Sequence, residues 1–196
     1  MNASRLLLAI ALCLAMTRCS AVANETFKID PAHSTIAFKV RHLLGSAKGK
    51  FTKFNGTIDV DREQPEKSSV TVSIQVASID TGIAKRDQHL RSEDFFNVQK
   101  FPEITFKSRQ VKQAGPTAEI TGDLTMRGVT REITLRVLLL GMPESAGKNQ
   151  TTRWRVTTAP IKRSQFGLTW SKSVEAVSMI GEDVSIDIEI EAARAL

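Results

Sequence analysis

Three histidines lead the small set of residues in this chain that could do chemistry. His33, His42 and His89 are the only histidines among 196 residues, and three imidazoles are enough to hold a catalytic zinc ion. Their spacing matches no metal-binding motif, and the sequence contains no GxSxG or HExxH motif that would indicate hydrolase chemistry. We therefore predict neither a metal site nor a catalytic set.

A charged run, RDQHLRSEDFF, begins at Arg86 and interrupts a sequence that otherwise alternates apolar and polar residues. It predicts a short helix over residues 84–93, on which Asp87 and Arg91 could pair at i, i+4. Arg86 and His89 would share one helix face. One interpretation is a solvated helix that plugs the end of the fold. The other is that Arg86 and His89 lie at the mouth of a cavity and contact the polar end of a ligand.

His42 has the same parity as the apolar residues Ile36, Phe38 and Val40. In a regular strand its ring would therefore point to the apolar side. A histidine in such a place is most often a structural residue that forms hydrogen bonds. Contact with a ligand head group and metal ligation are the alternatives.

The elements that must position these residues are strands, because apolar and polar residues alternate with a period of two. The pattern is cleanest over residues 184–191, and it recurs over 70–76 and 133–137. Further strands are predicted over residues 26–30, 35–42, 48–61, 103–113, 117–126 and 153–162. About nine short antiparallel strands favour a closed barrel, which removes exposed sheet edges. We expect an all-β fold with one short helix, in which about eight strands enclose an apolar pocket.

Residues 1–23 have the pattern of a cleaved secretory signal. Residues 6–16 form an apolar segment too short to anchor stably across a bilayer, and an A-x-A cleavage site ends at Ala23. Cleavage there would leave residues 24–196 as a single domain, and both cysteines would be removed with the signal. The exported domain must then be stable without disulfides.

The charge balance is mildly basic, with a net charge of +6 for the whole chain. Lysine and arginine are spread along the predicted strands among acidic residues, without the aromatic platforms typical of nucleic-acid binding. We therefore do not expect a nucleic-acid partner. Attraction to an anionic lipid surface and a merely solvated surface both remain open.

Four stretches of the sequence resemble successive blocks of the YceI-like family of lipid or polyisoprenoid-binding proteins. They are IDPAHSTIAFKVRHLLGSAKGKF (29–51), RDQHLRSEDFFNVQKFPEITFKS (86–108), ITGDLTMRGVTREITL (120–135) and RSQFGL (163–168). The resemblance covers essentially the whole chain after the signal, in order. It implies a lipocalin-like, extended antiparallel β-barrel in the bacterial periplasm, with a long apolar pocket for an isoprenoid or other fatty chain.

The resemblance also implies two sets of ligand-binding residues. Polar residues expected at the pocket mouth are His33, His42, Arg86, Asp87, His89 and Arg163. Apolar residues expected to line the pocket are Phe38, Phe95, Phe106, Phe166 and Leu168. The resemblance implies no catalytic set, and the expected ligand is a bound isoprenoid or fatty lipid rather than a cofactor.

We expect a periplasmic carrier or store for a long isoprenoid-type lipid, such as a polyprenyl or quinone side chain. A transient contact with a membrane or a membrane redox protein, and a homodimer, are compatible with that role. Two alternatives stay open. One is a stress-response or interaction module whose own side chains fill the barrel. The other is an enzyme for a lipidic substrate, with His42 or His89 as general base.

Overall fold

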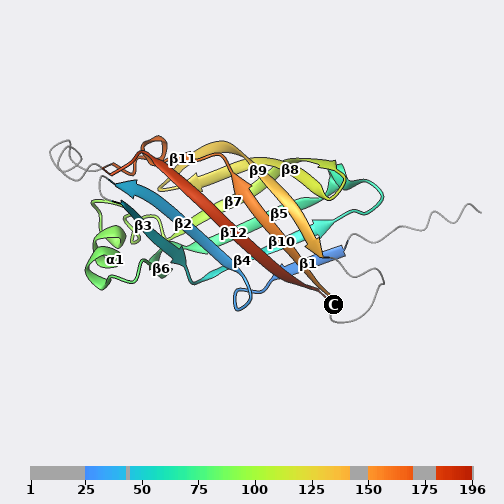
Figure 1. Ribbon diagram of the computed structural model, residues 1–196, viewed down its shortest axis with the longest axis horizontal. Helices are drawn as coiled ribbons and strands as arrows, with labels where there is room; N and C mark the ends of the chain where they lie inside the picture. Colours follow the sequence, from blue (N-terminus) through green and yellow to red (C-terminus); the bar gives the residue numbers. More distant parts are fainter. Residues whose placement is uncertain (1–24, 43–44, 142–149, 170–179, 196) are drawn as a thin grey trace, which may run out of the picture.

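The computed structural model describes residues 25–42, 45–141, 150–169 and 180–195, in which twelve strands form one antiparallel sheet (Figure 1). The predicted signal lies outside the described residues. The strands are β1 (Glu25–Ile29), β2 (Thr35–His42), β3 (Gly45–Phe51), β4 (Phe54–Val60), β5 (Ser69–Gln75), β6 (Ile79–Asp80), β7 (Glu103–Ala114), β8 (Thr117–Met126), β9 (Val129–Gly141), β10 (Thr151–Thr158), β11 (Ile161–Lys162) and β12 (Asp183–Arg194). The helices are α1 (Ala84–Arg91) and the short 3₁₀ turns η1 (Pro65–Lys67), η2 (Val76–Ser78) and η3 (Arg163–Phe166).

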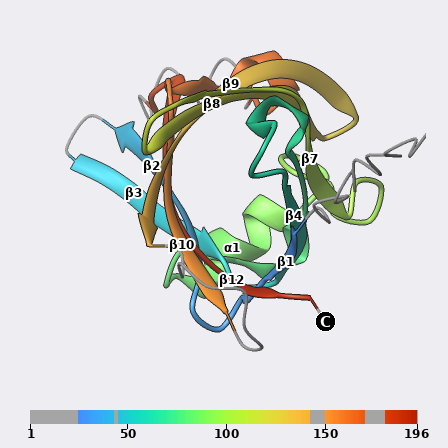
Figure 2. The same cartoon turned by 90° about the vertical axis from the view of Figure 1, so that its right-hand side faces the viewer.

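Eight of these strands close into a barrel, which confirms the predicted fold. The order around the ring is β1, β4, β5, β7, β8, β9, β10 and β12. The ring closes because β12 pairs back onto β1, with Phe27 opposite Arg194. Figure 2, seen along the long axis, shows the strands as a ring with α1 at its far end. Among the described residues, no helix has the length and apolar character needed to cross a bilayer.

The seam of the barrel is shared between two strands that lie along the same edge of β12. The half nearer the end of the chain pairs with β1, whereas Val184 to Glu189 pair with β2. The chain crosses from β1 to β2 at Ser34, whose hydroxyl donates to the carbonyl of Glu191 (3.1 Å) and accepts from its N–H (2.9 Å). Strands β2, β3 and β6 therefore extend the sheet at one end only, the end that carries α1 (Figure 1).

Two predicted strands are each interrupted in the structure. The strand predicted over residues 48–61 is β3 followed by β4, and it breaks where the N–H of Thr52 donates to the carbonyl of Ser78 (3.2 Å). The strand predicted over residues 153–162 is β10 followed by β11, and it breaks beside Pro160, which has no N–H to donate to a ladder. The predicted helix ends two residues early, at Arg91.

Candidate ligand-binding site

Two cavities follow one another along the barrel interior. The first, which we call the mouth chamber, lies at the α1 end and has a volume of about 370 Å³. The second, the inner chamber, lies deeper in the ring and has a volume of about 180 Å³. Both are lined by the same five side chains, which form a waist between them: Phe51, Ile104, Met126, Ile161 and Ile186. The two cavities therefore adjoin each other along the barrel interior.

The inner chamber is lined by the apolar faces of the ring strands. Among its described lining residues the one polar side chain is Thr158, whose hydroxyl donates to the carbonyl of Thr134 (3.0 Å). Phe106, predicted as a lining residue, lies here. At the end far from α1, Trp154 packs edge-on against the fully buried Phe27, with ring centroids 6.1 Å apart. A ligand in this chamber would contact hydrocarbon almost everywhere.

Aromatic rings dominate the mouth chamber. Four predicted lining residues surround it: Phe38, Phe95, Phe166 and Leu168. The ring of Phe38 fits because its cross-strand partner is Gly49; a Cβ there would lie 2.4 Å from Phe38 Cζ. Any larger residue at that position would displace Phe38 from its place in the chamber wall.

The polar lining of the mouth chamber is entirely basic or neutral. The polar residues are Arg41, His42, Thr81, Arg86, His89 and Arg163, and none of the described lining residues is acidic. Positive charge is therefore concentrated at the α1 end of an otherwise apolar cavity. Such a rim favours a ligand whose polar end is anionic or rich in hydrogen-bond acceptors.

Arg86 lines the mouth chamber, and part of its guanidinium is already engaged by the fold. Its Nε donates to Thr81 Oγ1 (2.8 Å) and its Nη2 donates to the Thr81 carbonyl (2.9 Å). These bonds hold the side chain against the turn before α1. Arg86 therefore fixes the geometry of the mouth as well as contributing charge to it.

Asp87 does not line either cavity, which corrects its predicted place at the mouth. Its carboxylate is buried and accepts hydrogen bonds from the N–H (3.0 Å) and the hydroxyl of Thr81. The pair expected between Asp87 and Arg91 does not form. Arg91 instead donates to the carbonyls of Ala77 in η2 and Ile79 in β6, which ties α1 to both elements.

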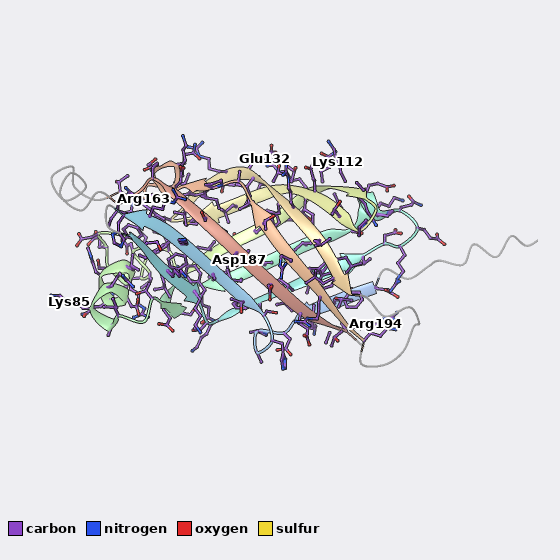
Figure 3. All side chains as sticks on the ribbon, viewed as in Figure 1. Lys85, Lys112, Glu132, Arg163, Asp187 and Arg194 are labelled. Carbon is purple, nitrogen blue, oxygen red and sulfur yellow. The ribbon has the colours of Figure 1, made fainter. Side chains whose placement is uncertain are left out.

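Arg163 lines the mouth chamber with a side chain that is almost completely buried (5% exposed). It donates to the carbonyls of Leu168 (2.7 Å) and Gly181 (3.1 Å), and Glu182 lies 3.8 Å away. These contacts join η3 to the segment that enters β12. Figure 3 places Arg163 at the same end of the molecule as Lys85 on α1, far from Arg194.

The three histidines do not all meet in one site. His42 and His89 line the mouth chamber, and His89 Nε2 lies 3.9 Å from Asp94 Oδ2. His33 lies on the exposed turn after β1, where it pairs with Asp30 at 2.8 Å and lines neither cavity. It does not lie at the mouth, where it was predicted, because this turn precedes the Thr35 end of β2 and the mouth is at the His42 end. No cluster of potential metal ligands occurs in the described part of the chain.

Two parts of the site escaped prediction from the sequence. The waist is built from strands scattered between Phe51 and Ile186, so no local motif indicates it. Thr81 was also missed, although a local signal exists. Asp and Gly two residues apart, at Asp80 and Gly82, favour a turn, and Thr81 lies between them. In the structure Asp80 accepts a hydrogen bond from the N–H of Gly82 (2.8 Å), directly before the helix that begins at Ala84.

Comparison with known protein families and with known sequences points to one family. The family model described as YceI-like domain matches residues 27–192. The proteins named Protein YceI of Salmonella newport (strain SL254) and of Salmonella arizonae are each 45% identical over 159 residues, which is 80% of this chain and 82% of each relative.

Solved structures share the fold. Burkholderia cenocepacia BcnA superposes with a TM-score of 0.70 at 26% identity, covering 83% of this chain and 98% of that one. The Campylobacter jejuni YCEI protein has a TM-score of 0.69 at 29% identity, covering 80% and 90%. A polyisoprenoid binding domain from Saccharophagus degradans has a TM-score of 0.61 at 16% identity, covering 86% and 98%, a likeness of fold alone.

Proposed function

The chain belongs to the YceI-like family, and from this premise we propose that it binds the apolar chain of an isoprenoid-type lipid inside its barrel. The ligand's hydrocarbon tail passes through the waist into the inner chamber. Its polar end stays in the mouth chamber, beside the cationic rim. The protein thereby carries or stores a molecule that water alone would not keep dispersed.

The observation that carries this proposal is the shape and polarity of the interior. Two chambers in line, with a single polar side chain in the inner one, match a long and narrow apolar ligand better than a compact polar one. Each 100 Å² of hydrocarbon removed from water contributes about 2.5 kcal/mol before association costs. A chain that occupies both chambers therefore gains more binding free energy than one that reaches only the mouth.

The isoprenoid class is supported by the structural neighbour from Saccharophagus degradans, which is described as a polyisoprenoid binding domain. The proposed role is binding rather than catalysis. Arg86 and Arg163 donate to backbone carbonyls of the fold, and His33 lies away from the cavities. The proposed site of action is the bacterial periplasm, which rests on the signal pattern of residues 1–23.

The first test is to identify what the protein carries. Protein purified from a bacterial periplasm without detergent is analysed by native mass spectrometry, and the adduct is then extracted into solvent and identified. A stoichiometric lipid with a long unsaturated chain is the expected result. A ligand-free mass, together with no binding of added polyprenyl alcohol, would overturn the proposal. It would favour the alternative of an interaction module whose own side chains fill the barrel.

Trp154 offers a second test, because it lines the end of the inner chamber. The chain has two tryptophans, so Trp170→Phe leaves Trp154 as the single reporter. Adding a long polyprenyl alcohol should change its fluorescence in a saturable way. A short alcohol that fills only the mouth chamber should not. An unchanged signal with a ligand shown to bind by mass would mean that the tail does not enter the inner chamber.

A further inference from the structure

Strands β2 and β3 present two different faces. Phe38, Val40 and Ala47 point inward and line the mouth chamber. Because side chains alternate along a strand, the residues between them point outward. Lys39 and Lys48 are both exposed on that outer face. The same strand pair thus forms a wall of the mouth chamber and a charged patch on the molecular surface.

Lys39 and Lys48 lie directly opposite one another in the β2–β3 register. Like charges in directly opposite positions destabilise a sheet. The residue on the other side of Lys39, across the β2–β12 ladder, is Ser185 rather than an acid. Neither lysine forms an ion pair within the described residues. The fold therefore tolerates an unfavourable pair of charges at this position.

In the next outward-facing row of the sheet, further from the mouth, the positive charge has acidic residues opposite it. There Lys50 lies opposite Asp80 of β6, and Ala37 lies opposite Asp187 of β12. In the row nearer the mouth, Arg41 lies opposite Ser46. At the same end, Asp183 of β12 lies opposite Lys162 of β11. Among these rows, the row of Lys39 and Lys48 is therefore the one with two cations and no acid in the register positions opposite them.

The helix beside this face carries two further features. Lys85 is exposed on α1 and lies at the mouth end of the molecule (Figure 3). Ile83, directly before the helix, is 52% exposed, the highest of the large apolar side chains described as exposed. An exposed apolar residue two positions from an exposed lysine has the composition of a surface that contacts lipid head groups and the hydrocarbon just below them.

We propose that Lys39, Lys48, Lys85 and Ile83 form a docking face that places the mouth of the barrel on an anionic lipid bilayer. The lysines meet the negative head groups, and Ile83 enters the interfacial layer. This goes beyond binding of a lipid in the cavity, because none of the four side chains lines either chamber. It assigns the surface from which a cargo lipid enters or leaves.

Physical magnitudes make the proposal measurable. A lysine near an anionic membrane adds roughly a fivefold gain in partitioning, and the attraction decays within a Debye length of about 8 Å at physiological salt. Lys39→Glu with Lys48→Glu removes two cations and adds two anions. We expect this double variant to lose at least about tenfold in binding to anionic vesicles.

The test uses sedimentation with vesicles of phosphatidylglycerol and phosphatidylcholine, and with vesicles of phosphatidylcholine alone. The matched control is Lys107→Glu with Lys112→Glu. It makes the same charge change at exposed residues of β7, across the ring from β12. Expected results are binding of the wild type to the anionic vesicles only, weaker binding at high salt, and a much smaller loss in the control than in the docking variant.

Three outcomes would overturn the proposal. One is a wild type that does not bind anionic vesicles; the second is a docking variant that binds as well as the wild type. The third is equal loss in both double variants, which would show that net charge acts without a defined face. Ile83→Ser should weaken vesicle binding with no change in charge. Binding of a polyprenyl alcohol in solution should be unchanged in all variants, so a failed cavity proposal and a failed docking proposal remain distinguishable.

Discussion

Asp87 accepts hydrogen bonds from both the backbone N–H and the hydroxyl of Thr81. Asp87 is buried, with only 6% of the residue exposed. Thr81 lies on the turn between β6 and α1, so this clasp ties the first turn of the helix to the chain that enters it. Arg86, the preceding residue, donates to the hydroxyl oxygen and to the backbone carbonyl of the same threonine. Hydrogen bonds to Thr81 thus hold the charged run in place, and its residues Arg86, His89 and Leu90 line the mouth chamber.

Asp87→Asn should destabilise the protein, because a buried charged acceptor is replaced by an amide that cannot accept both bonds equally well. We expect a loss of about 1–3 kcal/mol in the free energy of unfolding. Urea denaturation measures it. The control is Asp94→Asn, since the Asp94 side chain is 78% exposed. A loss in the control as large as that at Asp87 would contradict a special role for the clasp.

Arg86→Ala should weaken binding of a lipid with an anionic head by about tenfold or more, because a charge-assisted hydrogen bond is removed. A hydrocarbon of the same length should lose much less. Fluorescence titration of both ligands measures the difference, with Lys85→Ala as a neighbouring control that lines neither chamber. Equal losses for both ligands would mean that Arg86 acts by holding Thr81 and not by meeting the head group.

Met126→Phe should narrow the waist and so discriminate by chain length. Met126 lines both chambers, and a rigid ring would replace a flexible side chain there. Long prenyl chains should bind more weakly, whereas chains short enough for the mouth chamber should bind as before. Titration with a series of chain lengths measures the effect, and Leu138→Phe on the exposed outer surface is the control. Uniform loss at all lengths would contradict a waist.

His33 should titrate above its ordinary range, because its hydrogen bond to Asp30 raises the pKa of His33 and lowers that of Asp30. The raised pKa means that the His33 contribution to stability is complete below pH 6.5 and is lost as pH rises through the folded value. The Asp30 contribution is present above pH 3.8 and is lost as pH falls through the lower folded value.

NMR titration of the histidine ring signals measures this pair directly. In Asp30→Asn the pKa of His33 should return toward its ordinary value, since its largest cause is removed. Lipid binding should show no change in either protein, because His33 lines neither cavity. A His33 signal that titrates identically in both proteins would contradict the contact.

The charged helix and most of its mouth residues could be predicted from the sequence, because their signals are local. Arg86 and His89, which helical spacing places on one face, both line the mouth chamber. Asp87, one residue away, was misplaced. Helical spacing shows which side chains share a face, but not which of them finds an internal partner. That partner, Thr81, precedes the helix on a turn whose path depends on how β6 joins β3.

The sequence by itself determined the class of fold. Apolar and polar residues that alternate with a period of two indicate a strand and show which of its side chains are buried. It also contained the blocks that indicated the family, which the match to residues 27–192 confirms. The tertiary structure alone decided which strands are neighbours. The shared edge of β12 separates His33 from the mouth, and strand pairing brings Ile104, Met126 and Ile186 together at the waist. A period of two carries no information about pairing between distant strands, and the site exists only where such pairings close the barrel.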